Sequence, residues 1–254
     1  MHTNEGVSMD VMHWIVVLLV VFLAFQYLVG PILVYFNQKL PESYRFKLLE
    51  SEPFLEQRGR VFQQLHQEIC ESGFRYVGSS EMHMSHSALY FSVYYSEPRK
   101  LSVLLMTAHA ENTTPFTQIE FVQLYRDGSL LSVSNNGLFS VYPEWDIKQM
   151  YRFPQVNDFT ELLQITDRLI GKYKTKSVAE ALPQGEEFSI IEAHLNDEMA
   201  HLVEIGWVSP VVRDHERGLT FKGAVLMTWK MCWPVKILIN KIDVNRSLSA
   251  LENA

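Results

Sequence analysis

The chain has 254 residues, of which 47% are hydrophobic and 20% charged, and its net charge is −7. This length suits one domain, or one domain with a small appendage, and the negative balance argues against a nucleic-acid partner, which needs a basic face. The two cysteines, Cys70 and Cys232, do not make a disulfide framework.

An apolar stretch runs from Trp14 to Phe36 and contains no Asp, Glu, Lys, Arg or His. At about 1.5 Å per residue it spans roughly 34 Å, enough for a hydrocarbon core of ~30 Å. A cleaved signal peptide would need a basic start, and residues 1–13 hold no Lys or Arg. The sequence predicts a transmembrane helix over 14–36, with Trp14 and Phe36 as membrane contacts at its ends and a kink at Gly30-Pro31.

The charges beside this helix predict its orientation. Residues 1–13 carry no positive charge, whereas the helix is followed by Lys39, Arg45, Lys47, Arg58 and Arg60. Positive loops stay in the cytoplasm. We therefore expect a single-pass membrane protein with an extracytoplasmic tail over 1–13, the N-terminus outside and residues 37–254 in the cytoplasm.

The first cytoplasmic residues, 37–55, read as a juxtamembrane connector, and an α+β domain is expected over 56–174. It opens with a helix over about 56–72, because an apolar stripe recurs at helical spacing at Val61, Phe62, Leu65 and Ile69. Ser72-Gly73-Phe74 is typical of a glycine C-cap.

The composition and the residue pattern of residues 75–141 predict strands. The run Leu89–Tyr95 is rich in aromatic and β-branched residues, and apolar and polar residues alternate around Leu101, Ile119 and Leu131. Asp127-Gly128 predicts a tight hairpin of type I′. These short returns predict an antiparallel meander of four to six strands.

Helices resume after the strands. Asp158 to Glu161 has the form of a capping box, followed by an apolar stripe over about 158–173. Residues 175–221 are expected to form a helical segment, with a helix over about 187–204 and a small hairpin that turns at Asp214–Gly218.

Two short stretches, Leu202–Val208 and Gly218–Gly223, resemble the helix end and wing of winged-helix regulators, in which a Leu-rich helix, a hairpin and Leu-Thr-x-Lys-Gly follow one another. The resemblance implies a local winged-helix fold. The charge departs from that family, since residues 188–218 hold six acids and two arginines, a net charge of 2 − 6 = −4. A recognition helix that faces phosphates should be basic, so DNA binding is not expected to carry over.

The segment 222–241 is predicted to be one amphipathic helix, followed by a tail over 242–254. On a helical wheel its four lysines fall within about 140° and two tryptophans flank them; these candidate membrane contacts are Lys222, Trp229, Lys230, Trp233, Lys236 and Lys241. A cationic strip beside a wide apolar face is typical of an interfacial helix. A helix packed on the domain core, or a second membrane pass, remains an alternative, although Lys230 and Lys236 would lie deep inside a spanning helix.

Motifs for chemistry are sparse. Glu198-x-x-His201 has the spacing of di-iron ligands, but the chain holds one copy where such sites need two. His83, His86 and His109 lie near predicted strands without a nucleophile motif. No catalytic, cofactor-binding or metal residue is assigned, and no cofactor is expected.

We therefore predict an α+β membrane protein that serves as a non-enzymatic interaction or scaffolding module, with the lipid bilayer as its expected partner. One alternative is an enzyme or small-ligand binder that uses a cleft between the meander and the 158–173 helix. Another is a membrane-tethered regulator with a winged-helix tail.

Overall fold

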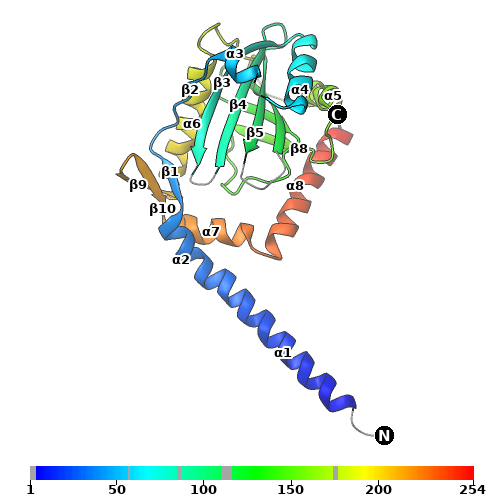
Figure 1. The fold of residues 1–254 in the computed structure, drawn as a ribbon, viewed down its shortest axis with the longest axis vertical. Helices are drawn as coiled ribbons and strands as arrows, with labels where there is room; N and C mark the ends of the chain where they lie inside the picture. Colours follow the sequence, from blue (N-terminus) through cyan, green and yellow to red (C-terminus); the bar gives the residue numbers. More distant parts are fainter. Residues whose placement is uncertain (1–3, 57, 85–86, 110–115, 174–176) are drawn as a thin grey trace. The chain divides into compact units, whose positions relative to one another are not determined.

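The computed structural model of the chain describes residues 4–56, 58–84, 87–109, 116–173 and 177–254, and it has the predicted α+β fold (Figure 1). The chain forms two compact units. We call residues 1–44 and 195–239 the anchor unit, and residues 45–194 and 240–254 the sheet unit. Residues 45–194 of the sheet unit are thus inserted in the chain of the anchor unit and residues 240–254 follow it, whereas the sequence predicted consecutive segments over 56–174 and 175–221.

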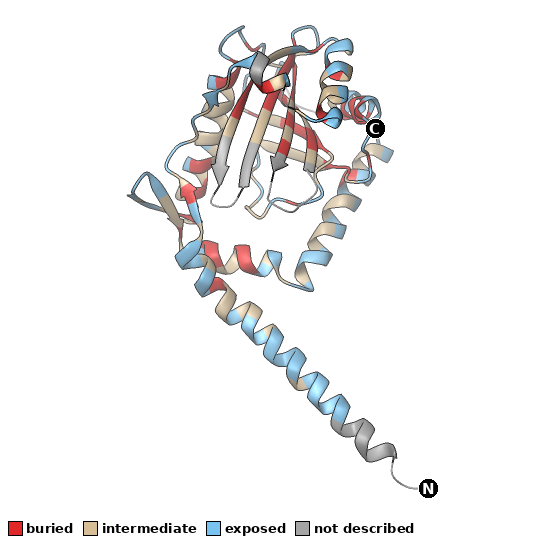
Figure 2. Cartoon of the chain, viewed as in Figure 1, coloured by how far each residue is buried: buried red, intermediate tan, exposed pale blue. Residues whose placement is uncertain are grey.

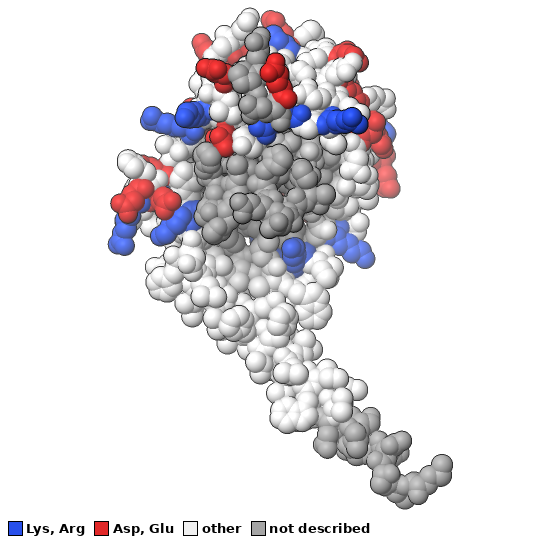
Figure 3. Space-filling model, viewed as in Figure 1, with Lys and Arg blue, Asp and Glu red and all other residues white. Residues whose placement is uncertain are grey.

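The anchor unit begins with a long apolar helix made of α1 (Asn4–Ala24), a π-helical turn η1 (Phe25–Val29) and α2 (Gly30–Asn37). Within the described residues, the stretch Val11–Asn37 is the one helix long and apolar enough to cross a membrane. Its side chains are mostly exposed (Figure 2), and the visible face of this stretch carries no charged side chain (Figure 3). A π-helical turn lies directly before Gly30-Pro31, where the sequence predicted a kink.

A small sheet completes the anchor unit, with the strand order β1 (Lys39–Pro41), β10 (Glu216–Leu219), β9 (Val208–Arg213), all antiparallel. The hairpin β9–β10 turns at Asp214 and His215, whose φ angles are 54° and 60°. Two left-handed residues between paired strands make a type I′ turn. The predicted hairpin is confirmed, and residues 39–41 of the predicted connector are a strand of this sheet.

The segment 222–241, predicted as one helix, forms parts of two: α7 (Phe221–Met231) and α8 (Val235–Glu252). The physical reason is Pro234, which has no N–H to continue α7 and disfavours helical backbone at Trp233. Residues 242–252 of the predicted tail belong to α8. The helix before the hairpin, α6 (Glu187–Glu204), has the predicted bounds.

The sheet unit contains a seven-stranded sheet with the strands in chain order: β2 (Lys47–Leu48), β3 (Arg75–Met84), β4 (Ser87–Ser96), β5 (Leu101–His109), β6 (Phe116–Leu124), β7 (Leu130–Ser134) and β8 (Lys148–Arg152). Neighbours from β2 to β7 are antiparallel, which confirms the meander. The last strand, β8, pairs in parallel with β7 and was not predicted.

Helices α3 (Ser51–Glu56), α4 (Arg60–Glu71) and α5 (Phe159–Lys172) contribute to the core on one face of this sheet. The ring of Phe159 on α5 lies 5.3 Å from Phe121 and 6.2 Å from Phe74, centre to centre. Aromatic side chains therefore pack between the meander and the 158–173 helix, where one alternative function predicted a ligand cleft. Val61, predicted on the buried stripe of α4, is exposed.

The helix cap and the C-cap glycine predicted from local sequence are confirmed, and one predicted turn is not. Asp158 accepts a hydrogen bond from the Glu161 N–H at 2.8 Å, and Gly73 ends α4 with a φ of 86°. The exception is the turn at Asp127-Gly128, where Gly128 alone is left-handed, with a φ of 81°. The predicted type I′ geometry is wrong here, because a loop of three residues with a terminal left-handed glycine closes the hairpin.

Candidate membrane-interface site

The most informative site of the anchor unit is centred on two backbone carbonyls of the apolar helix. Pro31 has no N–H to offer the carbonyls one turn before it, those of Gln26 and Tyr27. Proline is tolerated in apolar helices where other groups satisfy such carbonyls. The groups that do so here come from the segment 229–232, about two hundred residues along the chain.

Three hydrogen bonds join residues 229–233 to the apolar helix. The indole Nε1–H of Trp229 donates to the Tyr27 carbonyl at 3.3 Å, and the Cys232 thiol lies 3.8 Å from the Gln26 carbonyl. In return the Tyr27 hydroxyl donates to the Trp233 carbonyl at 2.9 Å. The rings of Tyr27 and Trp229 also meet edge to face, 6.2 Å apart. We call these residues the anchor junction.

Helix α7 packs along the apolar helix between this junction and the C-terminal end of that helix. The ring of Phe221, at the start of α7, meets Tyr35 at 6.2 Å. Gly30 lies one to two helical turns before Tyr35. It faces Thr228 so closely that a β-carbon at position 30 would lie 2.9 Å from the Thr228 methyl carbon. A small residue at a helix crossing is how apolar helices approach closely. Helix α7 therefore runs beside the anchor from the level of Tyr35 to that of Tyr27.

The residues before α7 fasten it to α6 and explain the short motif Leu219–Gly223. Thr220 caps α7 by accepting the Gly223 N–H at 3.0 Å, and its hydroxyl donates to the Gly206 carbonyl at 2.7 Å. The ammonium of Lys222 donates to the Ile205 carbonyl at 2.9 Å, where the negative end of α6 favours a cation. Lys222 thus has a capping role that the predicted cationic strip did not include.

The other predicted membrane contacts are divided between two helices. Lys230 on α7 lies 5.8 Å from the Trp207 ring, whereas Lys236 and Lys241 are exposed on α8. The four lysines consequently do not form one strip. The tryptophans remain about half exposed, Trp229 at 46% and Trp233 at 47%, and Trp14 and Phe36 are exposed on the apolar helix.

Sequence reasoning missed Tyr27, Gln26 and Cys232 as members of this site. A proline inside a predicted spanning helix does signal that nearby carbonyls need donors from elsewhere. It does not say which distant residues supply them, because pairing over this separation leaves no periodic mark in the sequence.

No family model, no curated protein and no solved structure matches the chain. The interpretation of the site consequently rests on its own geometry, and the winged-helix resemblance stays a prediction.

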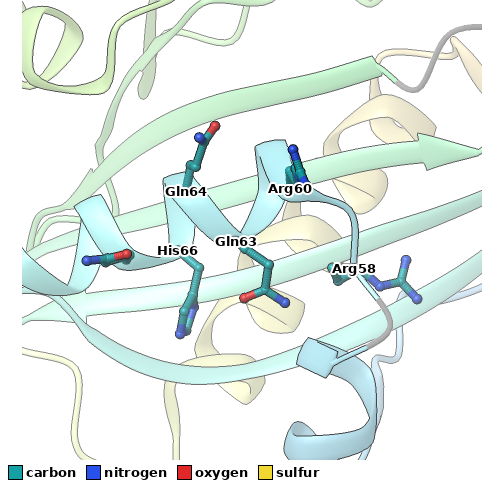
Figure 4. Close-up of a pocket in the computed structure, with 6 residues that line it drawn as sticks. Arg58, Arg60, Gln63, Gln64 and His66 are labelled. Carbon is teal, nitrogen blue, oxygen red and sulfur yellow. The ribbon is translucent and has the colours of Figure 1, made fainter.

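The sheet unit offers a shallow hollow of about 470 Å³ beside α4, lined by Arg58, Arg60, Gln63, Gln64, His66 and Gln67 (Figure 4). These side chains point in several directions instead of converging. The Arg58 guanidinium lies over the rings of Phe54 and Tyr90, at 4.2 and 4.1 Å from their centres, and His66 Nδ1 is hydrogen bonded to the Tyr94 hydroxyl at 3.0 Å. Two of the lining residues thus serve the packing of the core.

Burial explains the state of the His66–Tyr94 pair. It lowers the pKa of His66 and raises the pKa of Tyr94. The tyrosine therefore stays protonated and is hydrogen bonded to a neutral imidazole. Such a pair is a structural hydrogen bond inside the core and needs no ligand.

The remaining candidates for chemistry give no site. Within the described part of the chain, no three His, Cys, Asp or Glu side chains gather closely enough to hold a metal ion. His201, from the Glu-x-x-His pattern, lies 3.9 Å from Glu204 on the same helix. The side chains of His83, His86 and His109 lie outside the described residues.

Proposed function

We propose that this chain is a membrane-anchored, non-enzymatic interaction module, with its N-terminus outside and the sheet unit in the cytoplasm. The observation that carries the proposal is the anchor junction: side chains of Trp229 and Cys232 meet the carbonyls that Pro31 cannot serve. A helix that only tethered a soluble domain would make no such contacts with a distant segment of the chain. Here the apolar helix is part of the fold of the anchor unit, so membrane attachment and folding are one property.

The way the sheet unit is inserted also supports a display role. The chain leaves the anchor unit after Tyr44 and returns at Leu195. The Asn196 side chain ties these two points together: its Oδ1 accepts the Tyr44 N–H at 2.7 Å, and its Nδ2 donates to the Tyr44 carbonyl at 3.2 Å. The chain crosses between the units a third time at Ile239–Asn240, inside α8.

The orientation follows from charge. Lys39, Arg45 and Lys47 follow the apolar helix and none precedes it, so the positive side stays in the cytoplasm. A reporter that is active only outside the cytoplasm, fused after Ala254, should be silent. Neutralising these three residues while adding lysines before His13 should weaken or invert the orientation. A strong signal from the unaltered fusion would contradict the proposal.

The interaction role needs a second measurement. The tagged full-length chain, extracted from its own membranes in mild detergent, should have a mass well above that of the 29.5 kDa chain purified alone in the same detergent. A chain that has the same mass in both preparations and converts a small metabolite would favour the enzyme alternative.

The regulator with a winged-helix tail remains the other candidate. It is favoured by the order of a helix, a type I′ hairpin and a capped α7 in the anchor unit. The net charge of −4 over 188–218 opposes phosphate binding. If this local fold binds a macromolecule, the charge favours a protein.

A further inference from the structure

The turn between α7 and α8 exposes a group of large apolar side chains. We call residues 229–238 the elbow. Its exposed large apolar members are Trp229 at 46%, Met231 at 40%, Trp233 at 47%, Ile237 at 58% and Leu238 at 57%. Single exposed apolar residues are ordinary, whereas a group of them at one helix–helix turn is a candidate binding surface.

The anchor junction fixes where this surface lies along the apolar helix. Trp229 and Trp233 are hydrogen bonded to Tyr27, which lies ten residues before the helix end at Asn37. The apolar stretch Val11–Asn37 has 27 residues, about 40 Å at ~1.5 Å each. It exceeds a hydrocarbon core of ~30 Å by about 10 Å, the depth of the headgroup boundary.

A helix of about 20 residues spans the hydrocarbon core. If the helix enters this core near Val11, it therefore leaves it near Pro31. Tyr27 then lies just inside the acyl region of the cytoplasmic leaflet, and the elbow lies beside it. A helix too long for the core also tilts, which brings α7 closer to the membrane plane and keeps the elbow at the boundary. Indole rings prefer this level, because they are apolar with one polar N–H.

We propose that the elbow inserts Trp229, Trp233, Ile237 and Leu238 into the cytoplasmic leaflet beside the anchor, so that the bilayer is the partner of this surface. The inference rests on the proposed function, since it needs the apolar helix to span. It replaces the expected surface helix over 222–241 with a shallow insertion at the helix–helix turn. Lys236 is exposed on the same elbow, and its long stem can carry the ammonium out to the headgroups.

The test uses the full-length chain in nanodiscs, with one spin label at a time. Leu238→Cys reports the elbow, and Val211→Cys on β9 is the matched control, since both are exposed apolar residues of the anchor unit, at 57% and 55%. Leu18→Cys reports the anchor itself. Cys70→Ser and Cys232→Ser remove the native thiols, and serine at 232 keeps a donor for the Gln26 carbonyl.

The measurement is the accessibility of each label to oxygen, which concentrates in lipid, and to a water-soluble nickel chelate. At Leu238 the chelate should lose access almost to the level found at Leu18, while Val211 stays accessible. Equal chelate access at Leu238 and Val211 would overturn the inference and leave the anchor standing. Chelate access at Leu18 would overturn the proposed function instead. Spin–spin broadening at Leu238 together with chelate access would identify a second copy of the chain as the occupant.

Discussion

Gly223 lies against the carbonyl of Trp207 so closely that a β-carbon at position 223 would stand 2.1 Å from the Trp207 oxygen. The first turn of α7 therefore packs directly on the backbone that follows α6, and the residue at this position has to be glycine. Backbone atoms on the other side of the contact cannot rotate away as a side chain would.

We expect Gly223→Ala to destabilise the anchor unit by about 2–3 kcal/mol, in the range for overpacking a filled site. Chemical unfolding of the full-length chain in nanodiscs, followed by tryptophan fluorescence, measures the change. Gly171→Ala is the matched control, because nothing lies within 4 Å of a β-carbon there and the residue is inside α5. The control should be neutral or stabilising by up to ~1 kcal/mol. Equal midpoints for the two variants would contradict the close approach.

The β6–β7 turn supports a prediction for the sheet unit. Gly128 has a φ of 81°, a backbone conformation that costs a β-branched residue about 1–3 kcal/mol. Gly128→Val should lower the free energy of unfolding by that amount. Gly137→Val should change it little, since Gly137 has no left-handed φ and no atom within 4 Å of a built β-carbon. A midpoint for Gly128→Val equal to that of Gly137→Val would show that the glycine is not required.

The two turns illustrate what the sequence could and could not predict. Asp127-Gly128 located a turn correctly, because glycine accepts the left-handed region at no cost, but the same letters fit both a two-residue and a three-residue loop. Asp214-His215 lacks glycine and yet forms the type I′ turn. Turn type is set by the register of the paired strands, which the local sequence does not display.

The same contrast holds for the larger elements. Helix α6 and the cap at Asp158 follow from local spacing and local hydrogen bonds, and both were predicted. The parallel strand β8, the insertion of the sheet unit and the anchor junction depend on residues far apart in the chain. The break at Pro234 could have been predicted from proline chemistry alone. The prediction of one helix over 222–241 relied instead on the positions of the lysines on a helical wheel.

Arg152 is a buried cation of the sheet unit, with its side chain 3% exposed. Its guanidinium donates to Asp243, to the Asn240 side chain at 2.9 Å and to the Asn136 carbonyl at 3.0 Å. Asp243 is 29% exposed and can be rehydrated without the guanidinium. The Asn240 and Asn136 acceptors lose a charged donor, and an acceptor left unsatisfied inside a protein costs about 1–3 kcal/mol.

We therefore expect Arg152→Ala to cost about that much in urea unfolding of the full-length chain. Arg246→Ala removes an exposed pair with Glu144 from the same helix α8, and should cost at most about 1 kcal/mol. Similar losses for both variants would show that Arg152 does not hold α8 within the sheet unit.

His66 predicts a dependence of stability on pH. Burial lowers its pKa in the folded state below the ordinary value of 6.5, so the unfolded chain takes up the proton at a higher pH than the folded one. The free energy of unfolding should then rise with pH up to about 6.5, and this contribution should be lost as the pH falls through the folded pKa. His66→Gln can still accept the Tyr94 hydroxyl and does not titrate, so it should flatten this part of the profile. A profile that keeps its slope in the variant would assign the effect to another group.

The close packing of α7 on the apolar helix supports the last prediction, a double-mutant cycle between Gly30 and Thr228. Thr228 is 6% exposed, and its hydroxyl donates to the Ala224 carbonyl at 2.7 Å, which holds the methyl carbon toward Gly30. Gly30→Ala should therefore push α7 off the apolar helix and cost about 1–3 kcal/mol. Thr228→Ser keeps the hydroxyl bond, removes the methyl group and should cost about 0.8 kcal/mol.

The double variant should lose less stability than the sum of the two single variants, because the methyl group that would clash with the new β-carbon at position 30 is gone. Unfolding in nanodiscs measures all four corners of the cycle. Additive losses would mean that Gly30 and Thr228 do not touch, and the close packing of α7 on the anchor would then be refuted.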